Sequence, residues 1–226
     1  VQRRRRRRAD AALRLSYQQN QDLAGRLITA QEVERTRIAR DLHDDASQEA
    51  AGLAMSLSLL TARVGEMPAA AEVVRSLTDL QERTVALGEN LRTLSHELHP
   101  GVLQYAGIVA ALRSYTKEFE QRQGIRVQFE AMEGFRDLDP EVALCLYRVA
   151  QEALTNAGRH SGAGEVVVTL DRIHGCVQLS IGDNGAGFVH DHRDRRGLGL
   201  RSIDERVRLL GGTARVTSIP GRGTTV

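Results

Sequence analysis

The long proline-free stretch near the beginning of the chain limits the possible folds most. Residues 9–64 contain no proline and only two glycines, and Leu, Ile and Ala recur there at helical spacing. This pattern predicts one long helix, whose early part is typical of a signalling coiled coil of marginal stability. The segment Gly65-Glu66-Met67-Pro68 then breaks the helix, and a second apolar-periodic stretch runs from Val73 to Leu98. The apolar residues of the first stretch include Leu13, Ala24, Leu27, Ile38, Leu42, Leu53, Leu57 and Leu60.

Two antiparallel helices of this length cannot bury wide apolar faces by themselves. Two copies of the hairpin would form a four-helix bundle, so we predict a homodimer through it. After Pro100 the pattern changes to an α/β mixture. Helices are predicted at 108–121, 140–159 and 202–210, and strands at 125–130, 166–170, 176–181 and 214–218.

The predicted fold class is therefore α+β, with an antiparallel helical hairpin in a dimeric four-helix bundle followed by an α/β sandwich. We expect a basic segment and coiled coil at residues 1–30, the helical hairpin at 31–100 and the sandwich domain at 101–226. The composition and the apolar periodicity of the sequence change close to these boundaries.

The net charge of +2 derives from one run, Arg3–Arg8, because removing these six arginines leaves −4. A surface for nucleic acid would depend on that run alone, so we expect no direct binding of nucleic acid. The run is either a solvated end or an anchor beside a membrane, where arginines gather. Cys145 and Cys176 form neither a CxxC pair nor a zinc spacing, so we expect no disulfide framework and a reducing, cytoplasmic setting.

No apolar stretch is long enough to cross a bilayer, and there is no signal peptide. The chain begins at Val1 rather than at a methionine. We therefore expect the cytosolic portion of a longer protein, with a sensory or membrane part upstream.

One histidine has neighbours suited to phosphoryl chemistry. His43 lies in a charged helical stretch, with Asp44 next to it and Gln48 four residues after that carboxylate. This spacing places Asp44 and Gln48 on one helix face beside the histidine. A neutral imidazole nitrogen is nucleophilic, and an adjacent carboxylate can hold the other N–H and accept its proton. The pattern predicts that the chain phosphorylates itself on His43, and the simpler alternative is a solvent-facing histidine.

A glycine-rich segment, Asp183-Asn184-Gly185-Ala186-Gly187, follows a predicted apolar strand. The Asp183 carboxylate can accept a hydrogen bond from an exocyclic amine such as that of adenine. Gly185 and Gly187 let the backbone approach a flat ring closely. The segment is therefore a candidate site for the base of a nucleotide.

Two further segments are suited to the phosphates of a nucleotide. Gly197 and Gly199 precede a predicted helix, whose N-terminal amides can meet phosphate oxygens. Glu152 and Asn156 lie four residues apart on one helix face. Their side chains offer the oxygen ligands that Mg²⁺ prefers.

Taken together, these segments resemble the sensor histidine kinases of the DesK/NarX-like group, which combine a HisKA-type-three hairpin with a GHKL-type ATPase domain. The resemblance covers nearly the whole chain from about Gln31 onward. The matching segments are RIARDLHDDASQ at 37–48, LSHELHPGVLQYAGIVAAL at 94–112, LYRVAQEALTNAGRHSGA at 146–163, DNGAGF at 183–188 and GLGLRSIDERVRLLGG at 197–212.

The resemblance implies a role for each motif residue. His43 would be the phosphoacceptor, Asp44 its base and orienting partner, and Gln48 the amide that positions water to dephosphorylate a partner. Asn156 would hold Mg²⁺ with the help of Glu152. In the ATP site, Arg159 and His160 would approach the phosphates, and Asp183, Gly185 and Gly187 would meet the adenine. Gly197 and Gly199 would form the lid hinge, Leu200 would belong to the nucleotide site, and Thr224 would lie near the base.

The implied function is ATP-dependent autophosphorylation followed by transfer to an aspartate in the receiver domain of a response regulator, with phosphatase activity on the same partner. Two other classes remain open: a GHKL ATPase clamp, and a dimeric scaffold without catalysis. The hairpin that carries His43 argues against the clamp. The intact Asn156 and Asp183 argue against the scaffold.

Overall fold

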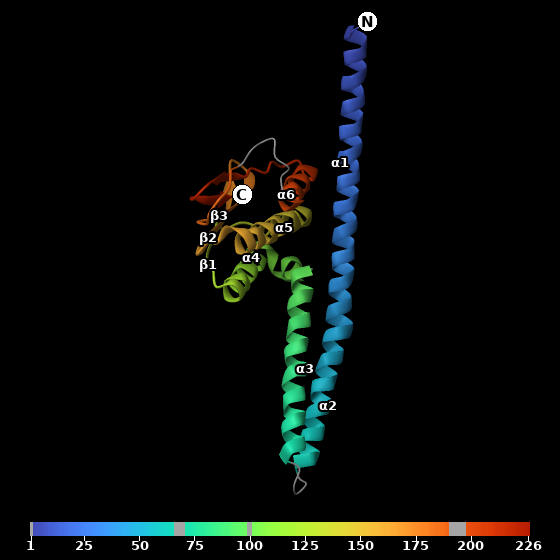
Figure 1. The fold of residues 1–226 in the computed structure, drawn as a ribbon, viewed down its shortest axis with the longest axis vertical. Coiled ribbons are helices and arrows are strands. Elements are labelled where there is room, and N and C mark those ends of the chain that lie inside the picture. The colour runs from blue at the N-terminus through green and yellow to red at the C-terminus, as the bar shows by residue number, and fades with distance from the viewer. Residues whose placement is uncertain (1, 66–70, 99–100, 190–197) are drawn as a thin grey trace. The chain divides into compact units, whose positions relative to one another are not determined.

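A computed structural model describes residues 2–65, 71–98, 101–189 and 198–226 (Figure 1). It divides into two compact units, Thr29–Gly101 and a second unit formed by Val102–Val226 with Val1–Ile28. Among the residues described, no helix is both long and apolar enough to span a bilayer.

The predicted first helix is confirmed as one continuous helical segment. Helix α1 begins at Gln2 and ends at Asp41, and helix α2 covers Ser47–Gly65. Between them lies η1, a π-helix over Leu42–Ala46. A π turn closes hydrogen bonds over five residues instead of four, and nothing in the apolar spacing predicted it.

Helices α2 and α3 (Ala71–Leu98) run side by side as the predicted hairpin (Figure 1). They approach closely at small residues, since a Cβ at Gly88 would lie 3.5 Å from the Cβ of Ala50. Near the C-terminal end of α3, the buried Ser95 Oγ donates to the carbonyl of Ala39 at 2.8 Å. Large apolar side chains nevertheless stay exposed on both helices, among them Leu53, Leu59, Leu60, Leu80 and Leu87.

Helix α4 covers Gly101–Gln123, and it begins seven residues before the predicted start at Ile108. The difference has a local cause at Gly107, where φ is 78° and ψ is 176°. This conformation is open to glycine and interrupts the helix, so the chain bends there. The apolar pattern that predicted the helix begins directly after this bend.

The second unit contains a five-stranded sheet in the order β1-β2-β3-β5-β4. Strands β1 (Arg126–Ala131) and β2 (Glu165–Ile173) are parallel, and the other neighbours are antiparallel. The remaining strands are β3 (Cys176–Asp183), β4 (Thr217–Ile219) and β5 (Gly223–Thr225). The strand predicted at 214–218 begins later, at Thr217, because it pairs with only the three residues of β5.

Helices α4, α5 (Pro140–Asn156) and α6 (Leu198–Leu209) cover one face of this sheet (Figure 1). Asp139 caps α5 by accepting from the N–H groups of Glu141 and Val142. After Asn156 the helix continues as a second π segment, η2 (Ala157–Ser161). The fully buried core residues include Leu112, Leu154, Val166, Val168, Leu170 and Ile203. The predicted order of a helical hairpin followed by an α/β sandwich is confirmed.

Helix α6 begins at Leu198, earlier than the predicted start at Ser202. The prediction that Gly199 precedes the helix was therefore wrong, because Gly199 lies in its first turn. Leu200 packs against the core and Ile203 is fully buried, so the helix gains apolar contacts from its first turn onward.

Candidate functional site

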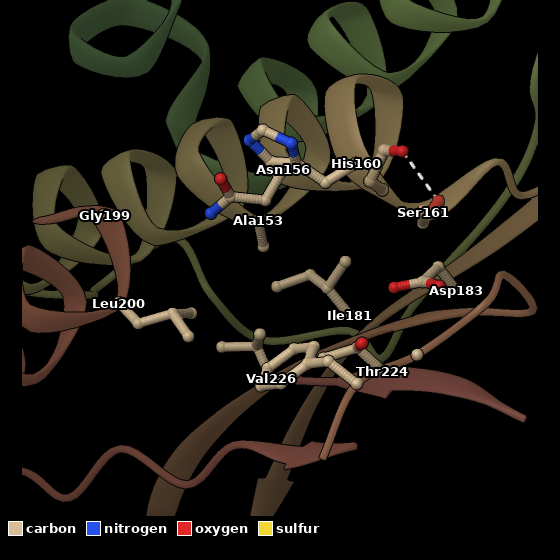
Figure 2. Close-up of a pocket in the computed structure, with 13 residues that line it drawn as sticks. Ala153, Asn156, His160, Ser161, Ile181, Asp183, Gly199, Leu200, Thr224 and Val226 are labelled. Carbon is tan, nitrogen blue, oxygen red and sulfur yellow. Dashed lines mark hydrogen bonds between the residues drawn. The ribbon is translucent and has the colours of Figure 1, made fainter. Parts of the chain in front are cut away.

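A cavity of about 400 Å³ lies between α5 with η2 on one side and strands β3 and β5 on the other (Figure 2). Its size is in the range of pockets that bind small molecules and cofactors. The lining residues are Ala153, Asn156, Ala157, His160, Ser161, Ile181, Asp183, Gly187, Phe188, Gly199, Leu200, Thr224 and Val226.

The middle of the cavity is apolar. Figure 2 shows Ile181, Leu200 and Val226 pointing into it from the sheet and from α6, opposite Ala153 of α5. The short side chains of Ala153 and Ala157, one helical turn apart, leave the space open. Such walls suit a flat, weakly polar ring, with polar groups at the rim to orient it.

The polar group nearest the sheet is Asp183, at the end of β3. Its Oδ1 accepts the N–H of Gly185 at 2.9 Å, which fixes the carboxylate at the start of the loop. The next residue, Asn184, accepts from the N–H groups of Gly164 and Glu165 at 3.0 and 3.1 Å. The loop is thus held rigidly, and the half-buried Asp183 faces the cavity as an acceptor.

The two glycines of this loop have different roles. Gly185 is buried but does not line the cavity, and a Cβ there would overlap the carbonyl oxygen of Ser161. Gly187 does line the cavity, has φ of 57°, and leaves room for the carbonyl of Ile219. Gly185 is therefore required for packing between the loop and η2.

Asn156 and Glu152 lie side by side on α5, as their spacing predicted. Asn156 Nδ2 donates to Glu152 Oε1 at 3.3 Å, so the amide oxygen of Asn156 remains for another group. Asn156 lines the cavity, and Glu152 is not among its lining residues. A Cβ at Gly199 would overlap the Glu152 carboxylate, so the first turn of α6 approaches this pair closely.

The oxygen atoms of Asn156 and Glu152 could bind a metal ion whose other ligands come from a bound molecule and water. Within the described part of the chain, no group of three or more His, Cys, Asp or Glu side chains could hold a metal ion. Mg²⁺ is usually bound through one or two carboxylates together with phosphate oxygens and water, and an amide oxygen is a hard ligand of the same kind. Asn156 and Glu152 fit such a site.

At the other rim, Thr224 of β5 lies in register with Asp183. Thr224 Oγ1 is 2.9 Å from Ser218 Oγ, which also accepts the N–H of Phe188 at 2.9 Å. On the helix side, His160 lines the cavity, whereas the neighbouring Arg159 is exposed and does not.

Sequence reasoning missed several wall residues. Ser161 donates its hydroxyl to the carbonyl of Ala157 at 2.6 Å (Figure 2). The carbonyl of Ser161 accepts the N–H of Ala186 at 2.7 Å. It thus joins η2 to the Asp183 loop. Phe188 was visible as the end of the DNGAGF motif, but the others carry no signal beyond their apolar character. They are Ala153, Ala157, Ile181 and Val226.

The cavity brings together most of the predicted nucleotide residues: Asn156, His160, Asp183, Gly187, Gly199, Leu200 and Thr224. Gly197 lies outside the described residues, and so does the lid predicted at 189–196 except for Val189. The residues predicted at the phosphoacceptor site, His43, Asp44 and Gln48, belong to the unit Thr29–Gly101.

His43 lies in η1 with its ring turned to Asp44. Its Nδ1 is 3.0 Å from Asp44 Oδ1, and the two side chains are 57% and 56% exposed. Nε2 is the ring nitrogen that remains for another partner. Gln48 is exposed at the start of α2, one residue after Ser47.

The helix before His43 carries an ion-pair ladder. Arg37 contacts Glu34 Oε1 at 2.6 Å and Asp41 Oδ2 at 3.2 Å. The hydrogen bond from Arg37 lowers the pKa of Glu34, so this carboxylate stays charged. These exposed pairs contribute little stability, but they favour helix up to the π segment.

Two families match the sequence. Residues 34–103 match the family described as Histidine kinase. Residues 141–226 match the family described as Histidine kinase-, DNA gyrase B-, and HSP90-like ATPase.

Among curated proteins, the sensor histidine kinase MctS of Rhizobium johnstonii is 39% identical over 210 residues, covering 90% of this chain and 44% of that protein. The oxygen sensor histidine kinase NreB of Staphylococcus carnosus is 36% identical over 200 residues, covering 88% of this chain and 56% of that protein. The chain therefore spans about half the length of these relatives. Among solved structures, the histidine kinase domain of the Erythrobacter litoralis EL346 blue-light activated histidine kinase aligns with a TM-score of 0.47 at 22% identity, covering 79% of this chain and 91% of that one.

Proposed function

The chain belongs to the histidine kinase family and carries the ATP-binding domain of that family at residues 141–226, and from this premise we propose that it uses ATP to phosphorylate His43. The observation that carries the proposal is the imidazole of His43, held at Nδ1 by Asp44 on an exposed helix. The same chain contains a cavity of the size and lining that a nucleotide needs.

At the phosphoacceptor, the geometry supports attack by Nε2. A hydrogen bond from Nδ1–H to Asp44 fixes the tautomer in which Nε2 carries the lone pair. Nε2 bonds to the γ-phosphorus while the bond from that phosphorus to the bridging oxygen of ADP breaks. The positive charge that develops on the ring is stabilised by Asp44, which accepts the Nδ1 proton when the product loses it.

In the cavity, Asp183 accepts a hydrogen bond from the exocyclic amine of adenine, and the ring lies between the apolar walls near Thr224. Gly187, Gly199 and Leu200 shape the wall beside it. Asn156, hydrogen-bonded to Glu152, would hold Mg²⁺, and the adjacent donor oxygens of the two side chains support this role. When bound, the ion would neutralise phosphate charge. His160 at the cavity and the exposed Arg159 next to it supply positive or donor groups toward the phosphates.

We further propose that the chain acts as a homodimer. The apolar side chains exposed along α2 and α3 include Leu53, Leu60 and Leu80, which are 55%, 48% and 47% exposed. Pairing two hairpins in a four-helix bundle would bury them. The partner in signalling is the receiver domain of a response regulator, which takes the phosphoryl group from His43 on an aspartate. In the opposing phosphatase activity, Asp44 and Gln48 support hydrolysis of the phosphoryl group from that aspartate.

Use of ATP suits a cytoplasmic location, and the relatives' additional length is consistent with a sensory or membrane part elsewhere in the protein.

The test is incubation of the chain with Mg²⁺ and γ-labelled ATP. We expect acid-labile, alkali-stable label on the native chain and none on His43→Gln. The matched control is His174→Gln, which changes an exposed histidine in the β2–β3 turn and should label like the native chain. Tight ATP binding without label would instead indicate an ATPase clamp, and neither binding nor label would indicate a scaffold.

A further inference from the structure

The helix that carries His43 contains one turn of a different kind. In a π turn a backbone N–H bonds to the carbonyl five residues earlier, and at η1, Leu42–Ala46, the N–H of Ser47 bonds in this way to the oxygen of Leu42. Such a turn holds about one residue more than an α-helical turn, and short π segments occur frequently at functional sites. The extra residue changes which side chains lie on the same side of the helix as His43.

Gln48 lies five positions after His43, and both side chains are exposed. At 3.6 residues per turn, five residues of an α-helix rotate a side chain to about 140° from the first. In a full π register of about 4.4 residues per turn, the same five residues would rotate by one revolution plus about 50°. Because η1 ends at Ala46 and Ser47 and Gln48 belong to α2, the separation lies between these two values, about 140° and about 50°. The π turn therefore brings Gln48 nearer to the side of His43 than α-helical spacing alone would place it.

Ser47 stabilises this π turn with two hydrogen bonds to one carbonyl. Its backbone N–H donates to the oxygen of Leu42, and its Oγ donates to the same oxygen at 2.9 Å. A helical serine hydroxyl usually bonds four residues back, as Ser56 does to Gly52 at 2.9 Å. In an α register, the corresponding carbonyl for Ser47 would be that of His43. The hydroxyl of Ser47 therefore favours the π register over the α register.

We infer that Ser47 is a positioning residue: it holds the helix in the π register and thereby keeps Gln48 nearer to the side of His43. The consequence for activity rests on the proposed function. An amide on that side can hold a water against a phosphorylated aspartate docked at His43. Autophosphorylation needs His43 and Asp44 but not Gln48, so loss of the Ser47 hydroxyl should separate the two activities.

The register can be measured without any activity by Gln48→His, with Zn²⁺ alone as the probe. Two imidazoles on one side of a helix can share a zinc ion, whereas two that lie about 140° apart cannot. We expect Gln48→His to bind one more Zn²⁺ per protomer than the native chain in isothermal titration calorimetry. The additional site should disappear when His43→Ala is combined with Gln48→His.

The role of Ser47 is then tested in the Gln48→His background. Adding Ser47→Ala should weaken the additional Zn²⁺ site about fivefold, which corresponds to one neutral hydrogen bond. Adding Ser56→Ala, the same change at a hydroxyl bonded four residues back, should alter it by less than about twofold. Ser47→Thr keeps a hydroxyl and should retain the site. A zinc site that does not depend on His43, or equal effects of Ser47→Ala and Ser56→Ala, would overturn the inference.

The activity test uses chains with native Gln48 and a receiver domain that takes label from the native chain, phosphorylated with acetyl phosphate. Ser47→Ala should slow phosphate release about fivefold and leave autophosphorylation within about twofold of native. Gln48→Ala gives the lower limit of phosphate release. An equal loss of both activities would assign Ser47 a merely structural role and overturn the inference. If even the native chain takes no label, the proposed function fails, while the zinc titration still decides the register.

Discussion

Asp183→Asn should separate nucleotide binding from folding. The Oδ1 of Asp183 accepts the N–H of Gly185 at 2.9 Å, and the carboxylate also faces the cavity. In the variant, the amide oxygen still accepts from Gly185, so the loop keeps its conformation. The new NH₂ group then points toward the position proposed for the adenine amine. Two donors face each other there, and the hydrogen bond to the base is lost.

The expected loss follows from the cost of that hydrogen bond. A hydrogen bond to a charged group contributes about 1.5–3 kcal/mol, so ATP should bind about 10- to 150-fold more weakly. Turning the amide around would restore the contact with adenine but leave the buried N–H of Gly185 without its acceptor, at a cost of about 1–3 kcal/mol. Because the two costs are similar, binding weakens in either orientation. The free energy of unfolding should change by less than about 0.5 kcal/mol when the Gly185 bond is kept.

The assay is calorimetric titration of ATP and ITP into native and variant chains, with thermal unfolding of each. Hypoxanthine carries a carbonyl where adenine carries its amine, so the amide group introduced by Asp183→Asn would donate to it. The ratio of ATP to ITP affinity should shift toward ITP by about tenfold or more. Asp171→Asn, on β2 of the same sheet and outside the cavity lining, is the matched control and should change neither affinity. ATP binding within about threefold of native, with no shift toward ITP, would refute the role of Asp183.

Three further substitutions test the packing that supports the two sites. Gly185→Ala would place a Cβ against the Ser161 carbonyl, so it should lower the free energy of unfolding by about 1–3 kcal/mol in denaturant titrations and weaken ATP binding in calorimetry. Gly164→Ala, where nothing lies within 4 Å of the added Cβ, should change neither quantity. Ser95→Ala removes the buried hydrogen bond to Ala39 and should lower the free energy of unfolding by about 1 kcal/mol, measured by chemical unfolding at fixed protein concentration. An equal effect of Ser76→Ala, at an exposed hydroxyl of the same helix, would contradict this. Gly107→Ala puts a side chain at φ 78° and should destabilise the second unit by about 1–3 kcal/mol, and an unchanged unfolding midpoint would show that the bend in α4 is not needed.

The sequence predicted the features that depend on periodicity and on local chemistry. The 3.6-residue spacing of apolar residues located the helical hairpin, and the alternation in 166–170 located β2, whose Val166, Val168 and Leu170 are fully buried. Asp183 could be placed at the end of β3 because an apolar strand precedes it directly. Asn156 and Glu152 could be paired because residues four apart adjoin on a helix.

Other features depend on contacts that are distant in sequence or on backbone hydrogen bonds alone. The π turn at Leu42–Ala46 changes only the hydrogen-bond partners of the backbone, so its residues look like those of the flanking helix. The close contact of Gly185 with Ser161 could not be predicted either, because Ser161 belongs to another element, η2. The start of α6 was placed too late, at Ser202, whereas burial of Ile203 and packing of Leu200 extend the helix to Leu198.

The position of the phosphoryl group on the ring of His43 tests the central claim most directly. Asp44 Oδ1 lies 3.0 Å from Nδ1, so the phosphoryl group should be carried by Nε2. Phosphorus NMR of the native chain after incubation with Mg²⁺ and ATP, with couplings to the ring protons, distinguishes the two nitrogens. The account predicts a single phosphohistidine signal from the Nε2 isomer that is absent in His43→Gln. A phosphoryl group on Nδ1, on another residue, or in His43→Gln as in the native chain would contradict it.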